Sequence, residues 1–271
     1  MTGAPCCFVY LPGAGGGEAD LSVLRASLGD AYRFETVDYP GWQSYICDGF
    51  STGMLIEQLA TQMAARVPQG PILIASASLG GHFAYAASLQ LQQMGREIAG
   101  FLAIDAFMID SSGPTVGWQS RAMDMGLDLV RKGDLGNLVR FVRSRFWRAM
   151  FRLSGGRLRD LLRQSAPSDR LPFPLSIDPI AEGELSMRLL LRAVAPWAPS
   201  LDRDPAPLHA PATLLRTPAT ASDDAAWLRR CPEMKIYEIP GQHLTLFEPE
   251  NIGSLRDAFI RATSDWCTFG Q

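Results

Sequence analysis

The sequence predicts an α/β fold in which a mostly parallel, doubly wound sheet carries a helical insertion. Short apolar runs, typical of buried strands, alternate with longer helical patterns through the first 112 residues, and the alternation resumes at Ala212. Such an alternation predicts βαβ units and therefore a parallel sheet. From Gly113 to Trp197 the strand pattern is absent and the sequence is helical in character. Ligands of parallel sheets bind at the carboxyl ends of the strands, so functional residues are expected there.

The predicted elements follow one another in a regular order. Strands are expected at Cys6–Tyr10, Arg33–Asp38, Pro71–Ala77, Ile98–Ile104, Ala212–Arg216 and Lys235–Ile239. Helices are expected at Glu18–Leu28, Thr52–Arg66, Leu79–Met94 and from about Pro249 onward, and within the insertion at Met123–Lys132, Leu135–Arg152, Leu158–Gln164 and Glu184–Val194. The short segments are mainly apolar and the longer ones amphipathic, as is typical of the two element types. We therefore predict a core of residues 1–112 and 198–271 and a helical insertion of residues 113–197.

Ser78 lies in the stretch LIASASLGGH, where a predicted buried strand runs directly into a helix. This is the pattern of a nucleophile elbow, in which a serine occupies a strained turn between a strand and a helix. Small residues two positions before and after the serine let the strand and helix pass closely. Gly80 meets the second requirement, and Ser76 stands where the first glycine is usual. Small residues also occur wherever a helix packs tightly on a sheet, so this pattern alone leaves both interpretations open.

A nucleophilic serine needs a general base, and the chain contains only three histidines. His243 follows the last predicted strand, which ends at Pro240 and Gly241, and precedes the last helix. This position after the serine matches the chain order of hydrolases built on such sheets. His82 is expected to pack under the elbow, and His209 is expected to be exposed. We therefore predict that His243 is the base, the alternative being a loop histidine hydrogen-bonded to a turn.

The acid that would orient this histidine has two candidate positions. Asp105 ends the almost wholly apolar strand in FLAIDAF, from which its carboxylate could reach the far nitrogen of the imidazole and set its tautomer. Asp223 and Asp224 follow the next-to-last strand, which is also a common position for the acid in hydrolases. They fit better as the N-cap of the helix that holds Trp227. We favour Asp105, because an ionised carboxylate at the end of an almost wholly apolar strand is unexpected unless it has a function.

A glycine-rich segment, YLPGAGGG, follows the first predicted strand. Its backbone N–H groups could stabilise a developing oxyanion, together with the N–H of Leu79 at the start of the helix after the elbow. A dinucleotide site is the alternative, but the segment lacks G-x-G-x-x-G and Asp38 at the end of the second strand is followed closely by Pro40. The sequence therefore favours an oxyanion hole over a nucleotide site.

Composition excludes several classes of protein. The chain has 271 residues, 47% of them hydrophobic, and a formal net charge of −3, which does not fit a strongly basic nucleic-acid binder. The chain has five cysteines, an odd number, and no C-x-x-C motif, so neither a disulfide framework nor a zinc site is predicted. We expect reduced thiols in a cytoplasmic protein. No leader peptide or membrane-spanning segment is evident.

Charge is concentrated in the insertion. It holds 14 of the 25 basic and 8 of the 28 acidic residues, a net of +6 that leaves −9 for the remainder. Its densest part contains eight arginines: Arg140, Arg143, Arg145, Arg148, Arg152, Arg157, Arg159 and Arg163. Arginine suits carboxylate and phosphate partners. An acidic partner docking on the insertion is one interpretation, and an ordinary solvated helix face is the other.

Three segments together resemble the chain-terminating thioesterase domains of polyketide synthases and nonribosomal peptide synthetases. They are FVYLPGAGGG, GPILIASASLGGHFAYAASLQLQQMGREIAGFLAIDAF and IPGQHLTLFEPEN, which cover most of the core. The resemblance implies an α/β-hydrolase fold with the insertion as a lid. It implies Ser78 as acyl-accepting nucleophile, Asp105 as acid and His243 as base, with the backbone N–H groups of Ala14 and Leu79 as oxyanion donors. Ser76 departs from the glycine usual in that family.

The resemblance also implies a reaction. A chain carried as a phosphopantetheine thioester on an acyl or peptidyl carrier protein is transferred to the serine, and then released by hydrolysis or by cyclisation. No metal or enzyme-bound cofactor is expected, and the carrier is expected to dock on Arg140, Arg143 and Arg148. Neither nucleic acid nor membrane is an expected partner. The alternatives are a discrete editing thioesterase, a small-ester carboxylesterase, and an inactive relative that only binds a carrier.

Overall fold

The computed structural model describes residues 5–17, 19–106, 130–131, 133, 135–165, 175, 178–243 and 245–268. The chain divides into two compact units. The core unit consists of Met1–Tyr39, Ser51–Ile109 and Pro196–Gln271, and the helical unit of Pro40–Phe50 and Asp110–Ala195. The helical unit thus includes a segment from before the elbow, which the sequence analysis had placed in the core.

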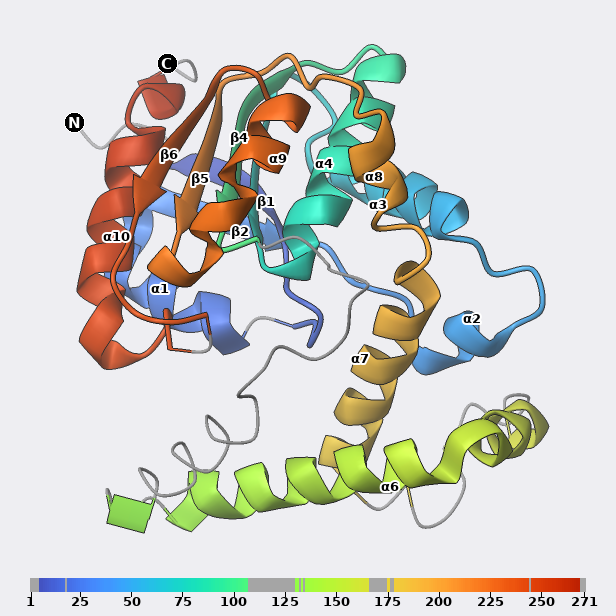
Figure 1. The fold of residues 1–271 in the computed structure, drawn as a ribbon. Coiled ribbons are helices and arrows are strands. Elements are labelled where there is room, and N and C mark those ends of the chain that lie inside the picture. Colours follow the sequence, from blue (N-terminus) through green and yellow to red (C-terminus); the bar gives the residue numbers. More distant parts are fainter. Residues whose placement is uncertain are drawn as a thin grey trace. The chain divides into compact units, whose positions relative to one another are not determined.

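The core unit is built on a six-stranded sheet in which all neighbouring strands are parallel (Figure 1). The strand order is β2-β1-β3-β4-β5-β6. The strands are β1 (Cys6–Leu11), β2 (Tyr32–Thr36), β3 (Ile72–Ala77), β4 (Ile98–Ile104), β5 (Ala212–Arg216) and β6 (Met234–Glu238). The predicted parallel sheet is confirmed, and β4 and β5 have the predicted bounds.

Helices cover both faces of this sheet (Figure 1). One face carries α1 (Ala19–Leu28) and α10 (Pro249–Thr263), which pack on each other, and the other carries α3 (Thr52–Arg66), α4 (Leu79–Gln93) and α9 (Asp224–Arg230). Shorter helical turns lie in the connections, namely η1 (Gly29–Ala31), α8 (Ser200–Arg203) and η4 (Pro218–Asp223), and η5 (Trp266–Thr268) follows α10. Helix α3 begins where Ser51 accepts a hydrogen bond from the backbone N–H of Met54 at 3.2 Å, an N-cap that satisfies an otherwise unpaired donor.

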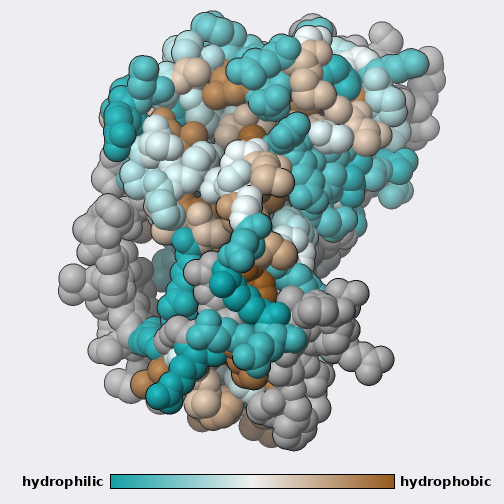
Figure 2. All heavy atoms as spheres, turned by 90° about the vertical axis from the view of Figure 1, so that its right-hand side faces the viewer, coloured by the Kyte–Doolittle hydropathy of each residue, from teal (hydrophilic) through white to brown (hydrophobic). Residues whose placement is uncertain are grey.

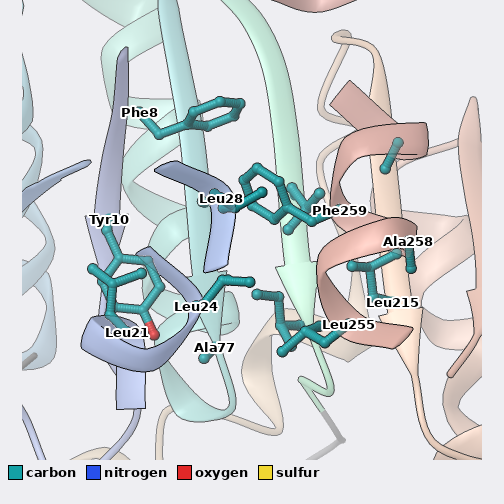
Figure 3. Close-up of a cluster of buried hydrophobic side chains, with 14 of the residues drawn as sticks. Phe8, Tyr10, Leu21, Leu24, Leu28, Ala77, Leu215, Leu255, Ala258 and Phe259 are labelled. Atoms are coloured by element: carbon teal, nitrogen blue, oxygen red, sulfur yellow. The ribbon is translucent and has the colours of Figure 1, made fainter. Parts of the chain in front are cut away.

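Aromatic rings form the centre of the core between the sheet and the pair α1 and α10 (Figure 3). The ring centroid of Phe8 lies 5.4 Å from that of Phe259 and 5.8 Å from that of Phe34. Phe8 and Tyr10 alternate along β1 with residues that face the other side, as the two-residue period of a strand requires. Aliphatic side chains from both helices complete this cluster: Leu21, Leu24, Leu28, Leu255 and Ala258.

A disulfide joins Cys6 at the start of β1 to Cys267 in η5, with Cα atoms 5.3 Å apart. The prediction of reduced thiols was therefore wrong for this pair. The two cysteines are separated by 261 residues, and only the packing of the chain's end beside β1 brings them together. The other three cysteines are free, and burial raises the pKa of the Cys231 thiol to about 12.

The helical unit consists of α2 (Trp42–Ile46), α6 (Leu135–Ser165) and α7 (Pro179–Val194) around their own apolar cluster. Two helices predicted for residues 135–152 and 158–164 are one continuous helix, although two glycines lie between them. The buried side chains of Trp147, Phe151, Leu158 and Leu162 share one face of α6, and their common packing outweighs the weak helix preference of glycine. The predicted helix Met123–Lys132 lies almost wholly outside the described residues, and α2 was not predicted.

Hydrophilic side chains are interspersed with smaller hydrophobic patches on the face drawn in Figure 2. Several exposed large hydrophobic side chains belong to α6: Leu135, Val139, Val142, Phe146, Met150 and Leu153. Arginines alternate with them along the helix. Among the described residues, no helix is both long and apolar enough to cross a membrane.

The core cluster predicts a large effect of Phe259→Ala. Phe259 is fully buried against Phe8 and Phe34, so its truncation leaves a cavity that the sheet cannot close. We expect the free energy of unfolding to fall by about 3–5 kcal/mol, measured by urea denaturation. The neighbouring Ile260, which is 39% exposed, provides the control substitution Ile260→Ala. Equal losses in the two variants would contradict this account of the core.

Candidate active site

Ser78 occupies the turn between β3 and α4 in a strained backbone conformation. Its φ is 53° and its ψ is −128°, in a region that residues with a side chain rarely adopt. The strand leads directly into this turn, and the backbone N–H of Ser78 donates to the carbonyl of Ile104 on β4 at 2.9 Å. The sheet therefore holds the serine at the carboxyl edge of its central strands, as expected for a nucleophile elbow.

Small residues around the serine are required by close backbone contacts. A Cβ atom on Gly80 would lie 2.3 Å from the carbonyl oxygen of Pro12 and 2.4 Å from that of Leu11, so no side chain fits there. Ser76 is completely buried and donates a 3.1 Å hydrogen bond to the carbonyl of Leu102 on β4. A serine is therefore accommodated at the first small position because its hydroxyl has a partner in the sheet.

A chain of two hydrogen bonds links Ser78 to a histidine and an aspartate. The Oγ atom of Ser78 lies 3.0 Å from Nε2 of His243, and Nδ1 of His243 lies 2.7 Å from Oδ2 of Asp105. Because an ionised carboxylate only accepts, Nδ1 carries the proton and donates to Asp105. In this tautomer Nε2 of neutral His243 has a free lone pair and accepts from the serine hydroxyl. The arrangement can move a proton from the serine to the imidazole.

Asp105 is held by more than the histidine. Its side chain is almost fully buried, and its Oδ1 atom accepts from the Thr217 backbone N–H at 2.8 Å and from the hydroxyls of Thr217 and Thr220 at 2.9 Å each. Burial alone raises the pKa of Asp105, but hydrogen bonds from His243, Thr217 and Thr220 outweigh it and hold the pKa below its ordinary value. The carboxylate is therefore ionised at neutral pH.

The two threonines were not found by sequence reasoning. They lie in the segment that follows β5, whose carboxyl end is next to that of β4 in the sheet. Polar residues that directly follow a strand of a parallel sheet are candidates for a functional site, and Thr217 and Thr220 have such positions. No pairing of β4 with β5 was predicted, however, so nothing in the sequence indicated that these two strands are neighbours.

Comparison with known proteins identifies the family. The family model described as "Thioesterase domain" matches residues 7–169, which is more than half of the chain. The chain belongs to the thioesterase domain family. A search of curated protein sequences gives no match.

Solved structures support the same fold for this thioesterase domain. The NocB thioesterase domain, in a covalent complex with a fluorophosphonate nocardicin G analog, is 17% identical with a TM-score of 0.60, covering 96% of this chain and 95% of that one. The Vlm2 thioesterase domain bound with a dodecadepsipeptide is 18% identical with a TM-score of 0.60, covering 96% and 94%. The four-domain nonribosomal peptide synthetase AB3403 is 16% identical with a TM-score of 0.61, covering 96% of this chain and 19% of that one. The thioesterase domain thus has an α/β-hydrolase fold.

The alternative acids have other roles in the thioesterase domain. Asp224 forms an ion pair with Arg216 at 2.8 Å, and Arg216 also pairs with Glu238. Asp223 stands at the N-cap position of α9, but its side chain makes no capping hydrogen bond. Asp223 is therefore at the predicted N-cap position but does not cap α9 through its side chain, because η4 leads into α9 with Asp223 already in a helical conformation.

The other two histidines have the surroundings that the sequence predicted. His82 is 1% exposed, and its Nδ1 accepts from Arg230 at 2.7 Å, as expected for a residue packed under the elbow. His209 is exposed shortly before β5, also as expected.

The predicted oxyanion donors belong to two segments that lie next to Ser78. Leu79 is the first residue of α4, so its backbone N–H has no partner within the helix. A Cβ atom on Gly13 would lie 3.3 Å from Cβ of Ser78, which places the loop that contains Ala14 close to the serine. These positions are compatible with two N–H groups directed at one oxyanion, and their assignment stays a prediction.

Two of the three arginines predicted to bind a carrier have partners within the helical unit. Arg143 pairs with Asp178 at 2.9 Å, and Arg148 pairs with Glu184 at 2.6 Å, both across the interface of α6 and α7. Arg140 is exposed on α6. No group of metal-binding residues is present in the part of the chain that the structure describes.

The lowered pKa of Asp105 predicts how stability varies with pH. Ionised Asp105 stabilises the fold above its unfolded pKa of about 3.9, and this contribution is lost as the pH falls through the lower folded pKa. Asn at this position does not titrate. We therefore expect the free energy of unfolding of the wild type to fall relative to Asp105→Asn as the pH is lowered from about 5 to about 2, measured by urea denaturation. A difference that does not change with pH contradicts the lowered pKa.

Proposed function

We propose that this chain is a serine thioesterase that releases an acyl or peptidyl chain from a phosphopantetheine thioester on a carrier protein. The observation that carries the proposal is the hydrogen-bonded chain of Ser78, His243 and Asp105 in a member of the thioesterase domain family. The same three side chains, in the same order of contacts, are the parts needed for acyl transfer through a serine.

In the first step, His243 removes the proton of the Ser78 hydroxyl while Oγ attacks the thioester carbonyl carbon. The backbone N–H groups of Leu79 and Ala14 stabilise the resulting oxyanion. Ionised Asp105 stabilises the imidazolium that forms, and the hydrogen bonds from Thr217 and Thr220 keep it ionised. His243 then gives its proton to the departing pantetheine sulfur as the C–S bond breaks, which leaves the acyl group on Ser78.

In the second step, the acyl-enzyme is attacked by water or by a hydroxyl or amine of the bound chain. His243 accepts the proton of this nucleophile and returns it to Oγ of Ser78 when the ester bond breaks. Water gives a free acid and an internal nucleophile gives a ring. Both outcomes use the same residues, and no step calls for a metal or a bound cofactor.

A carrier protein is the proposed partner, in a cytoplasmic setting. The solved relatives include a multidomain nonribosomal peptide synthetase, AB3403, and the helical unit of this chain carries most of its arginines. Arg140 is the proposed contact on α6, since Arg143 and Arg148 are each engaged by an acidic residue of α7. The cytoplasmic location stays a prediction, and the Cys6–Cys267 disulfide is a feature more common in oxidising compartments.

The test of this function compares two serines that lie two positions apart. The wild type is incubated with long-chain acyl pantetheine thioesters, and products and acyl adducts are analysed by mass spectrometry. We expect Ser78→Ala to lose roughly a thousandfold or more in kcat/KM and to form no adduct. Ser76→Ala, which removes a buried hydroxyl that bonds to the Leu102 carbonyl, is the matched control and is expected to keep most of the activity.

Each contrary outcome points to a different alternative. Turnover of oxygen esters but not of thioesters would indicate a carboxylesterase. Preference for short acyl groups would indicate an editing thioesterase. A wild type that gives neither turnover nor a Ser78 adduct across a broad panel would contradict an enzymatic function and favour a protein that only binds a carrier.

Docking of a carrier through Arg140 makes a separate prediction. Arg140→Glu should raise the KM for a carrier-linked acyl thioester by about 3- to 10-fold through charge repulsion, while kcat for small pantetheine thioesters stays unchanged. The control is Arg256→Glu on α10, which reverses the charge of another arginine; the Arg256 side chain is 42% exposed. The docking site is overturned if Arg140→Glu impairs turnover of the carrier-linked and the small thioester equally. It is also overturned if Arg256→Glu raises the KM for the carrier-linked thioester as much as Arg140→Glu does.

A further inference from the structure

The backbone that carries Asp105 is strained and is anchored on both sides. Asp105 has a φ of 43°, one of two positive values at non-glycine positions among the described residues, the other being Ser78. Such a conformation is unfavourable and persists only where the surroundings enforce it. On one side, the Asp105 N–H donates to the Leu215 carbonyl of β5 at 2.6 Å. On the other, the Ala106 carbonyl accepts from the indole N–H of Trp227 at 2.6 Å.

Trp227 also lies against the helix that begins after the nucleophile. A Cβ atom on Gly81 would be 2.4 Å from Cβ of Ala106 and 3.6 Å from the ring of Trp227. The first turn of α4 therefore packs directly on the residue after Asp105 and on the indole. Trp227 is completely buried, so its ring fills the space between the segment that follows Ser78 and the segment that follows Asp105.

A buried arginine, paired with a partly exposed aspartate, packs against this indole. Arg230 is completely buried, pairs with Asp202 at 2.9 Å and lies 5.1 Å from the centroid of the Trp227 ring. It also donates to Nδ1 of His82, whose ring stacks on Trp227 with centroids 5.5 Å apart. Because a guanidinium only donates, this His82 is neutral and carries its proton on Nε2. Burying a charge is costly and adds little net stability, which favours a role in orienting its neighbours.

We propose that Trp227, oriented by Arg230 and His82, is a positioning residue that sets the place of Asp105 relative to His243. The indole N–H fixes the carbonyl of Ala106, the residue after Asp105, and the Leu215 carbonyl fixes the peptide before Asp105. With both peptides fixed, the carboxylate keeps its 2.7 Å hydrogen bond to Nδ1 of His243. This inference rests on the proposed function of the same three residues.

The test uses Trp227→Phe, which keeps an aromatic ring but removes the donor to Ala106. The readouts are turnover of acyl pantetheine thioesters and the rate at which a small fluorophosphonate labels Ser78. We expect kcat and the labelling rate to fall roughly tenfold, since a small misplacement of the acid impairs proton transfer, while KM changes less than about twofold. Replacement of Trp227 by benzothienylalanine, in which sulfur takes the place of the N–H in a ring of the same shape, should give the same loss without a packing defect.

A double-mutant cycle separates positioning from a merely structural role. In an Asp105→Ala background, Trp227→Phe should change the labelling rate less than about twofold, because the residue through which it acts is absent. Trp266→Phe is the matched control, since Trp266 packs on Gly100 of the same strand β4, away from the carboxyl end that precedes Asp105. It is expected to change stability without changing kcat.

The outcomes are distinguishable from those of the proposed function. If the wild type is neither labelled at Ser78 nor active, the proposed function fails. If the wild type is active and Trp227→Phe causes the same fold-loss with and without Asp105, the positioning role is overturned. It is overturned equally if Trp266→Phe lowers kcat as much as Trp227→Phe, or if the benzothienylalanine variant keeps the full rate.

Discussion

Parallel pairing of β3, β4 and β5 is the constraint on which the site depends. Each strand ends at the same edge of the sheet, and each is followed by a residue of the site: Ser78, Asp105 and Thr217. Backbone hydrogen bonds continue the pairing one residue further, from Ser78 to Ile104 and from Asp105 to Leu215. A serine and an aspartate separated along the chain are thus placed within reach of one histidine by the sheet itself. Only His243 must be delivered from a loop.

Strain is concentrated where the chemistry is proposed to occur. Ser78 and Asp105 both have positive φ values, and each is held by contacts that a looser structure could not provide. At Ser78 the contact is the close passage of Gly80 by the carbonyls of Leu11 and Pro12. At Asp105 it is the hydrogen bond from Trp227 to the following residue. The rigid sheet and its buried helices supply the free energy that keeps both turns in an unfavourable conformation.

Charged side chains have different surroundings in the two units. In the core unit, the buried carboxylate of Asp105 is kept ionised by hydrogen bonds from His243, Thr217 and Thr220, and the buried guanidinium of Arg230 is matched by Asp202 and two aromatic rings. In the helical unit, partly exposed arginines pair with acids of the adjacent helix. The carboxylates of Asp178 and Glu184 in these pairs are only 10% and 9% exposed, so water screens the pairs less than it screens pairs on the surface. Their value lies in fixing the register of α6 against α7.

The sequence by itself determined what depends on neighbouring residues. Strand and helix patterns, the elbow at Ser78 and the loop histidine were all predicted, because backbone preferences and hydrophobic periods act over a few residues. It favoured Asp105 over Asp223 and Asp224 without excluding them. The tertiary structure decided what depends on residues far apart: the hydrogen bonds of Thr217 to Asp105, the partners of Arg148, the Cys6–Cys267 disulfide and the continuous helix α6. These contacts arise from strand order and packing, which no local pattern encodes.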